Sequence, residues 1–569
     1  MKKSIKYMTY MIFIIFGIIV SYLFLLSIFS TSYISTCPFP DKEFTYYCPD
    51  NPWMHIIILS IFSLIGILIF HFSHYTRRIV LILEKFAKYI PFVVFICGVL
   101  WIYTIKLVPI ADQLAVVNAA AYFKHGDFSF MEKGSYLDIY PHQLGLVLII
   151  YYFSLIFGEN NYMFFQLINV ISLAVIVFLS SKLAFEITKS KAISAIITYF
   201  SALFFPLFLY SVFIYGTMPG LALTFLSFYL LLRYINGDSV IKLVIAVFCI
   251  VIAVFIKQNY LIGLIAFSII LVFYSIKEKH FPSLLLLLLI IPIYLSGTVF
   301  INSEIKRITG ITPGSGYPKS SWIYMGMKEN ATKASGWFYD YTSEIYSTYD
   351  MDTDKTNSAI IYDIKIRLKD FINDPLYAIK FFSKKTASQW NNPTFQCFWI
   401  YLSSYSLDAR NLHQTDFTDK IIGISEDSTV NKNIINVFNT FQSFILFGAV
   451  LYCVYYIKRS AQETDIKTLL LPLFFIGGFL FHLMWEAKSL YTLPYFVTLI
   501  PLAIIGFKDF IIDLYVSTFV NKRMLSKPII ILIILVVLVL LISVLPWNIN
   551  NDIFKIVEYS EQYSTDTWN

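Results

Sequence analysis

Long apolar stretches alternate with short polar ones along most of the chain. Fourteen hydrophobic runs can be delimited, at residues 7–29, 54–74, 90–110, 141–158, 162–184, 192–214, 218–235, 240–256, 260–276, 282–301, 441–457, 468–484, 492–511 and 528–546. The run 529–545 carries no charge over 17 positions, and a helix needs about 20 apolar residues to cross the hydrocarbon core of a bilayer. The pattern therefore predicts an all-α polytopic membrane protein.

The distribution of positive charge indicates which runs cross. If the run 141–158 lies along the outer surface, the short inner segments hold 21 Lys and Arg residues and the outer segments and tail hold seven. The positive-inside rule expects such an excess. The run also opens with Pro141, His142 and Gln143, which suit a surface position. We therefore expect about 13 spans in the cell membrane, with a cytoplasmic amino terminus and an extracytoplasmic carboxyl terminus.

Composition agrees with a membrane protein. Hydrophobic residues make up 58% of the chain and charged residues only 14%, whereas soluble domains carry about 25% charged residues. The net charge of +7 does not indicate a nucleic-acid partner, because in a membrane protein the position of the cations is what matters. The first run is too long for a secretory signal peptide and lacks a small-residue cleavage site, so we expect a retained helix.

Four regions follow from the spacing of the runs. Residues 1–89 form an amino-terminal hairpin, 90–301 a membrane core with an outer loop at 111–160, 302–440 a large extracytoplasmic domain, and 441–569 the last helices and an outer tail. Within the large domain, the apolar spacing over 360–382 predicts a helix. The cysteines Cys37 and Cys48 share a short outer loop, where a disulfide and two free thiols are equally compatible with the sequence.

Asp112 follows the third run and opens the best candidate for a functional site. The stretch 114–123 predicts a short amphipathic helix, polar residues continue to Gln143, and the surface-lying run 141–158 comes next. A carboxylate at a membrane boundary is by itself more often a solvated helix end. Here it belongs to a platform at headgroup level, which suits an enzyme whose substrate has a polar head and a lipid tail.

The order of these features resembles the GT-C superfamily of membrane glycosyltransferases. It looks most like the bacterial members of the protein O-mannosyltransferase and aminoarabinose transferase group, glycosyltransferase family 39. The matching stretches are 108–113, 136–143, 255–259 and 485–494, with 322–326 and 389–393 in the large loop. The resemblance covers about residues 90–510 and is carried by the order and sidedness of these motifs. It implies a helical bundle with outer juxtamembrane helices and one large outer loop.

The resemblance also implies an activity and site residues. The enzyme would move a sugar from a polyprenyl-phosphate donor to a wall polymer, teichoic acid, glycolipid or protein outside the membrane. Asp112 would be the catalytic base. The candidate substrate-binding residues are Gln113, Asp127, Asp138, Tyr140, His142, Gln143, Lys257, Glu486 and Lys488. The family often has two adjacent acids, but Gln113 follows Asp112, so a second acid must come from elsewhere, such as Asp127 or Asp138.

Several of these side chains also have simpler interpretations. Lys257 and Lys488 could neutralise a leaving phosphate, or could be anchors that reach toward phospholipid headgroups. His142 could bind a sugar or phosphate, or could face headgroups at a helix start. Glu486 could bind a sugar hydroxyl or pair with Lys488. We predict no cofactor; outer carboxylates leave a divalent cation open, but no His or Cys cluster predicts a tight metal site.

Two other functions are compatible with the sequence. A transporter or flippase of envelope precursors usually has charged residues at mid-depth of its spans, and here the polar residues gather at the outer boundary instead. A non-catalytic sensor or scaffold on a decayed glycosyltransferase fold is compatible with the missing second acid.

Overall fold

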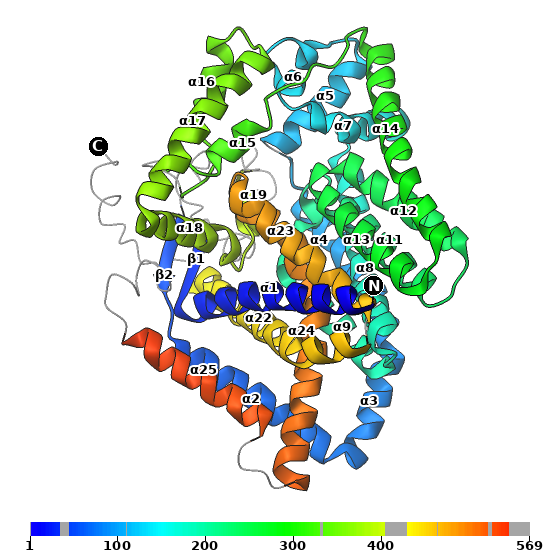
Figure 1. Cartoon of the computed structure of the whole chain (residues 1–569). Coiled ribbons are helices and arrows are strands. Elements are labelled where there is room, and N and C mark those ends of the chain that lie inside the picture. Colours follow the sequence, from blue (N-terminus) through cyan, green and yellow to red (C-terminus); the bar gives the residue numbers. More distant parts are fainter. Residues whose placement is uncertain are drawn as a thin grey trace.

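The computed structural model describes residues 2–34, 45–109, 111–329, 334–403, 429–463, 465–521 and 526–544. These parts are almost entirely helical, with one two-stranded antiparallel sheet, β1 (Ser30–Ile34) and β2 (Thr45–Pro49), among the described residues. Figure 1 shows a helical bundle with the sheet at one side and the helices around α5 and α16 at the top.

The described helices of the amino-terminal half and the membrane core are α1 (Lys2–Phe29), α2 (Pro52–His71), α3 (Ser73–Ala87), α4 (Ile90–Ile105), α5 (Asp112–Lys124), η1 (Ser129–Met131), α6 (Tyr136–Ile139), η2 (Pro141–Gln143), α7 (Leu144–Phe157), α8 (Tyr162–Thr188), α9 (Lys191–Leu203), α10 (Phe205–Leu209), η3 (Tyr210–Val212), α11 (Thr217–Ile235), α12 (Val240–Ile256), η4 (Gln258–Tyr260), α13 (Leu261–Glu278) and α14 (Phe281–Thr309). Those of the second half are α15 (Ser320–Met325), α16 (Tyr341–Thr348), α17 (Thr353–Asn373), α18 (Pro375–Trp390), α19 (Cys397–Ser403), α22 (Thr429–Glu463), η5 (Ile466–Leu469), α23 (Leu470–Met484), η6 (Ser489–Tyr491), α24 (Leu493–Tyr515), η7 (Val516–Val520) and α25 (Lys527–Ser543).

Nine helices in the described parts are long and apolar enough to cross a membrane, or eleven if each of two bent helix pairs is one span. Three shorter apolar helices accompany them, at Ile90–Ile105, Val240–Ile256 and Lys527–Ser543. Each of the fourteen predicted runs contains a helix, so the prediction of an all-α multi-pass membrane protein is confirmed. The number of 13 spans and the orientation of the termini stay predictions.

The two bends occur where the sequence places a proline. The run 192–214 divides into α9 and α10, which are inclined by 55°, and Pro206 follows Phe205 at the start of α10. The second bend, of 100°, separates Ser129–Ile139 from Pro141–Phe157. Proline lacks a backbone N–H, which a helix tolerates in its first turn but not in its interior, so a new helix begins at each of these prolines.

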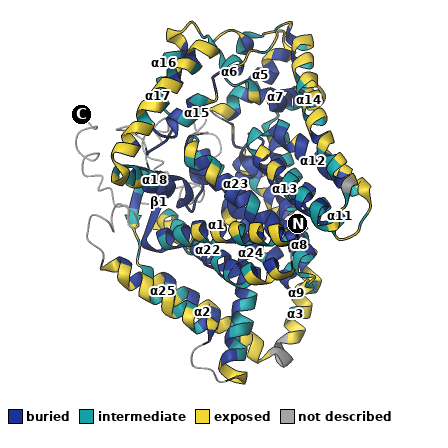
Figure 2. Ribbon diagram, viewed as in Figure 1, coloured by how far each residue is buried: buried dark blue, intermediate teal, exposed yellow. Residues whose placement is uncertain are grey.

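The centre of the bundle is formed by α1, α22, α23 and α24, which pack along one another. Helix α22 and helix α24 approach closely because small residues face each other. A Cβ atom on Gly506 would lie 2.3 Å from the carbonyl oxygen of Gly448. Figure 2 shows buried residues in this centre and exposed ones along α2, α14 and α25. Their exposed side chains are largely apolar, as expected for helices that face lipid.

The segment 302–440 packs against the bundle in its described parts. Trp390 and Phe395 belong to the same buried core as the membrane helices, and the Trp390 ring meets that of Phe475 with centroids 5.5 Å apart. The helix predicted over 360–382 is divided into α17 and α18, because Pro375 follows Asp374 and Asp374 caps the second helix. A separate outer domain stays a prediction.

The sheet after α1 was not foreseen, because its short polar stretches gave no clear alternation. Strand β1 is held to the 302–440 segment by Asn391, whose Nδ2 donates to the carbonyl of Ser30 at 2.7 Å. The backbone N–H of Ser32 donates in turn to the Asn391 carbonyl. Cys37 lies outside the described residues, and so does the question, left open by the sequence, of a disulfide with Cys48.

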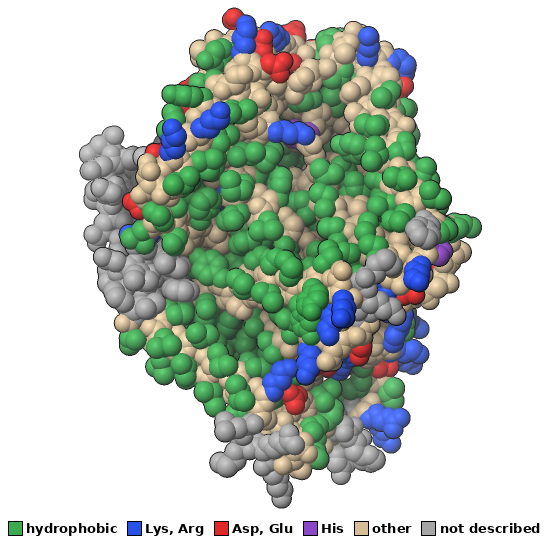
Figure 3. Space-filling model, viewed as in Figure 1, with side chains coloured by type: hydrophobic (Ala, Val, Ile, Leu, Met, Phe, Trp, Pro, Cys, Tyr) green, Lys and Arg blue, Asp and Glu red, His purple; other side chains and the backbone are tan. Residues whose placement is uncertain are grey.

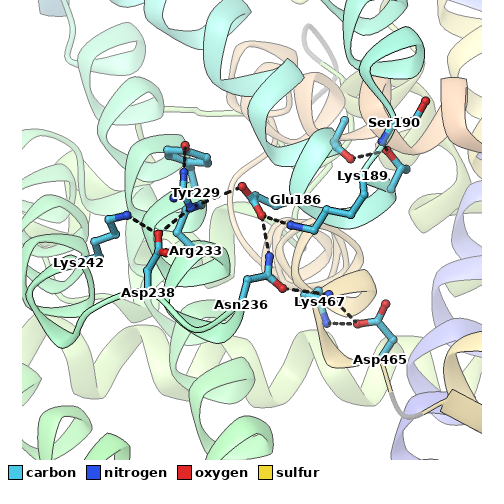
Figure 4. Close-up of polar contacts among 12 residues, drawn as sticks. Glu186, Lys189, Ser190, Tyr229, Arg233, Asn236, Asp238, Lys242, Asp465 and Lys467 are labelled. Carbon is cyan, nitrogen blue, oxygen red and sulfur yellow. Dashed lines mark hydrogen bonds and ion pairs between the residues drawn. The ribbon is translucent and has the colours of Figure 1, made fainter.

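One end of the core helices is tied together by a charged network, drawn in Figure 4. Glu186 near the end of α8 accepts a hydrogen bond from Asn236 at 2.6 Å. Arg233 of α11 pairs with Asp238 at 2.7 Å, and Lys467 donates to Asn236 at 3.1 Å. We call this end the network face, defined by Glu186, Lys189, Arg233, Asn236, Asp238, Lys242 and Lys467.

The opposite end of the same helices carries the candidate site. Helix α11 has 19 residues and is therefore about 28 Å long at about 1.5 Å per residue. This length matches the hydrocarbon core of a bilayer, about 30 Å thick. Tyr215 precedes α11 and Lys257 follows α12, so both lie at the end away from the network face. We call that end the site face.

Candidate functional site

Asp112 is the first residue of α5 and stands exposed at the site face. The residue before it, Ala111, has a positive φ of 51°, so the chain turns sharply into the helix. A carboxylate in the first turn is favoured by the positive end of the helix dipole. Its Oδ2 accepts a hydrogen bond from the hydroxyl of Tyr215 at 3.3 Å, which links α5 to the turn before α11.

Tyr215 is the centre of the polar contacts around Asp112. Its hydroxyl accepts a hydrogen bond from Nε2 of Gln143 at 2.7 Å and lies 3.5 Å from the hydroxyl of Tyr136. Gly216 follows with a φ of 75°, and a Cβ there would meet the carbonyl oxygen of Ile256 at 2.7 Å. The glycine therefore lets the Tyr215 turn lie directly against the end of α12.

Lys257 stands at that end of α12, where the chain breaks before α13. Its Nζ lies 4.2 Å from the centre of the Tyr215 ring and donates to the Tyr215 carbonyl at 3.3 Å. A cation over an aromatic face is stabilised by the ring quadrupole. Burial lowers the pKa of Lys257 to about 7, and the negative charge of Asp112 opposes this shift. The side chain thus changes its charge near neutral pH.

Aromatic side chains line one wall beside these groups. The Tyr140 ring meets those of Tyr317 and Trp322 at 5.7 and 6.4 Å, and the Trp322 ring stacks on Trp485 at 5.6 Å with the planes only 3° apart. His142 is exposed and lies 6.1 Å from Trp322. Figure 3 shows a hollow in the upper half of this face of the molecule. The rings of this aromatic wall, with their polar hydroxyl and N–H edges, form a surface that suits a ring-shaped polar ligand.

Negative charge converges on Tyr140. Burial raises its pKa well above the usual range, and the next contributions come from Asp112, Tyr317, Glu486 and Asp340, in that order. The carboxylates of the α5 start, the 338–340 turn and the loop after α23 are therefore close enough to act on one hydroxyl. Within the described parts of the chain, no three His, Cys, Asp or Glu side chains are grouped so as to hold a metal ion.

Three of the predicted binding residues support the backbone around the site. Gln113 is buried, and its Oε1 accepts a hydrogen bond from the N–H of Ile214 at 2.9 Å. Asp138 accepts from the N–H of Gly134 at 2.9 Å, and Asp127 accepts from the N–H of Ser129 at 2.9 Å. Their binding roles stay predictions. The contacts described here show Gln113 fixing the Tyr215 turn and the two acids closing turns.

The late loop after α23 brings Glu486 and Lys488 next to the segment 302–440. Glu486 is buried, and the carbonyl of Lys488 accepts a weak hydrogen bond from Gln389 at 3.4 Å. The loop is fixed by Lys385 of α18, which is fully buried. Its Nζ donates to the carbonyls of Gly326, Leu483 and Trp485 at 2.5, 2.9 and 2.7 Å. Three acceptors match the three N–H donors of an ammonium group.

Tyr215 and Lys385 were not foreseen from the sequence. A signal for Tyr215 does exist, because Tyr215, Gly216 and Thr217 form the short break between the apolar runs 192–214 and 218–235, on the predicted outer side. For Lys385 there is no comparable signal, since a lysine in an amphipathic outer helix normally points to water.

The arrangement combines an exposed carboxylate, a cation with a lowered pKa and an aromatic wall at one membrane face. A carboxylate can accept a proton from a hydroxyl nucleophile, and a cation can stabilise a negatively charged leaving group. No protein-family model, curated protein or solved structure matches this chain.

Proposed function

We propose that the chain is a membrane glycosyltransferase that moves a sugar from a polyprenyl-phosphate donor to an acceptor of the cell envelope. The observation that carries the proposal is that one tyrosine holds a carboxylate and a cation together at the site face. Asp112 accepts from the Tyr215 hydroxyl, and Lys257 lies over the same ring. A lipid-linked phosphate can reach this depth from the bilayer, and an acceptor can reach it from the water.

Asp112 acts as the general base. It takes the proton of the acceptor hydroxyl while that oxygen forms a bond to the anomeric carbon of the donor sugar. The bond between this carbon and the phosphate oxygen breaks in the same displacement, through a transition state with oxocarbenium character. The products are the glycosylated acceptor and the free polyprenyl phosphate, and a single displacement inverts the anomeric centre.

Lys257 stabilises the phosphate as it leaves. Its ammonium group is largely removed from bulk water, so its attraction to a phosphate is stronger than that of an exposed lysine. Tyr215 orients it through the ring and the backbone carbonyl. His142 lies within electrostatic range of Lys257 and is a second contact for the phosphate, and Lys488 serves the same role from the late loop.

The aromatic wall receives the sugar. Trp322 and Tyr140 offer apolar ring faces to the C–H groups of a sugar, and the Tyr140 hydroxyl and Glu486 offer hydrogen-bond partners to its hydroxyls. Glu486 is buried near Tyr140, so its carboxylate can distinguish one sugar hydroxyl from another at a desolvated position.

The experiment compares envelope glycans, by mass spectrometry, in cells with and without the protein. We expect one sugar decoration to disappear when the protein is absent and to return with the wild-type chain, but not with Asp112→Asn made at the same level. An unchanged set of glycans, or full restoration by the variant, would contradict the proposal. Release of free polyprenyl phosphate from the donor by the purified protein in detergent would separate a transferase from a carrier, because a carrier leaves the donor intact.

A further inference from the structure

Helix α3 divides its surface into three sectors. It joins two membrane helices, α2 and α4, and packs on α9. The sector toward the protein contains Val80, Glu84 and Ala87, which are buried or half-buried, and the hydroxyl of Tyr199 on α9 donates to the Leu83 carbonyl at 3.1 Å. At 100° per residue these three positions lie within one narrow stripe.

A second sector is apolar and largely exposed. It presents Ile79, Ile82 and Phe86, whose side chains are 57%, 53% and 52% exposed. On a soluble surface, three such neighbours on one face would be a costly patch. Their position between two membrane helices indicates that acyl chains cover them.

The third sector is cationic. Arg77, Arg78, Lys85 and Lys88 are exposed, and at 100° per residue they share a third sector, centred about 120° from the apolar one. Leu81 is the apolar residue among them. No ion pair between these four and an acidic group occurs among the described residues. A helix with separate apolar and basic sectors lies in the plane of the membrane surface, with its cations among the headgroups.

The membrane face is set by the neighbouring helices. Helix α4 ends just before the site face at Asp112, so its start at Ile90 lies at the other end, beside α3. Helix α2 ends at His71, whose ring meets that of Tyr515 near the end of α24 with centroids 5.9 Å apart, far from the start of α24 at the late loop. Both helices therefore place α3 at the network face. In Figure 1, α3 runs along the lower right edge of the bundle.

We propose that α3 lies in the bilayer surface at the network face and binds anionic phospholipid headgroups through Arg77, Arg78, Lys85 and Lys88. The guanidinium group of Arg can donate two parallel hydrogen bonds to the oxygens of a phosphate diester, and the ammonium group of Lys contributes a point charge. This lipid contact is independent of the reaction at the site face, because the two faces are a full membrane thickness apart.

The test counts lipids bound to the purified full-length chain. The detergent-solubilised protein is given equal amounts of phosphatidylglycerol and phosphatidylcholine, and retained lipids are identified by native mass spectrometry. The variant replaces the four cations, Arg77→Gln, Arg78→Gln, Lys85→Gln and Lys88→Gln, which keeps helix propensity. The control replaces four exposed lysines of the 302–440 segment, Lys319, Lys355, Lys365 and Lys369, with Gln.

We expect the wild type and the control to retain more phosphatidylglycerol than phosphatidylcholine. In the α3 variant, the ratio of the two bound lipids should fall about tenfold, since each cation at an anionic surface contributes to binding. If the fourfold variant does not purify as a folded monomer, the pairs Arg77→Gln with Arg78→Gln and Lys85→Gln with Lys88→Gln are each expected to show part of this fall. An unchanged preference in the α3 variants, or an equal loss in the control, would overturn the proposal.

Discussion

The hydroxyl of Tyr215 lies 3.3 Å from Oδ2 of Asp112, and the ring of the same tyrosine carries the ammonium group of Lys257 at 4.2 Å from its centre. One side chain therefore sets the distance between the carboxylate and the ammonium group of the site. Because Gln143 donates to this hydroxyl at 2.7 Å, the tyrosine proton is directed toward Asp112. Four results follow for variants of this site and its supports.

Asp112→Asn removes the base and keeps the shape of the side chain. We expect kcat to fall by about 10²- to 10⁴-fold, the usual contribution of a positioned general base. Stability changes little, because Asp112 is exposed and a first-turn carboxylate contributes only about 0.3–1 kcal/mol through the helix dipole. The measurement is transfer rate against donor concentration, with thermal unfolding as the control for folding. A variant with wild-type kcat would remove Asp112 from the mechanism.

Tyr215→Phe leaves the ring under Lys257 but removes the hydroxyl. Gln143 then loses its acceptor and Asp112 loses its donor, so we expect kcat/KM to fall about tenfold, in line with the loss of one or two hydrogen bonds. The loss should appear mainly in kcat, since donor binding through Lys257 is kept. The matched control is Tyr452→Phe, which removes a buried hydroxyl bonded to the Thr468 carbonyl at 3.0 Å, away from the site. Equal losses in the two variants would mean that Tyr215 acts only through stability.

The pH dependence of donor binding reports on Lys257. Its pKa is lowered to about 7, so the ammonium form is present below about pH 7 and is lost as the pH rises through that value. We expect KM for the donor to rise between pH 6 and pH 8. Lys257→Arg keeps the charge at all these pH values and should abolish the rise. His142→Gln should retain the rise in KM. If the rise were lost in His142→Gln and kept in Lys257→Arg, the titrating group would be His142 and the prediction would be wrong.

Lys385→Met tests the support of the late loop. The methionine fills a similar space, but three buried carbonyls lose their donor. We expect the free energy of unfolding to fall by about 3 kcal/mol, because an unsatisfied buried acceptor costs about 1–3 kcal/mol. Unfolding in detergent micelles is compared with Lys369→Met, an exposed lysine of α17. Similar stability of the two variants would show that the carbonyls find other donors.

The sequence predicted the features that depend on local spacing. The helix expected over 114–123 is present as α5, begins two residues earlier and starts at Asp112, and the break at Lys257 lies between two helices as its polar neighbours suggested. Both follow from hydrophobic runs and their polar interruptions, which act over a few residues.

Features that depend on helix rotation and on distant contacts were not accessible. Gln113 follows Asp112 by one residue, so it points about 100° away around α5, and its Oε1 accepts a hydrogen bond from the Ile214 N–H. Tyr215 reaches Asp112 from more than 100 positions along the chain. Lys385 is buried only because the end of α15, helix α23 and the late loop place three carbonyls around it.

The account rests on Asp112 and the 302–440 segment sharing the outer face, with the network face inside. The direct measurement labels intact cells with a membrane-impermeant thiol reagent. In each test chain the six native cysteines are replaced by alanine and one new cysteine is introduced. Asp127→Cys, Lys355→Cys and Lys191→Cys place it at exposed positions beside the site, in α17 and near Glu186. We predict that the first two react from outside and the third only after the cells are opened. Labelling of Lys191→Cys in intact cells, or protection of either of the others, would contradict the account.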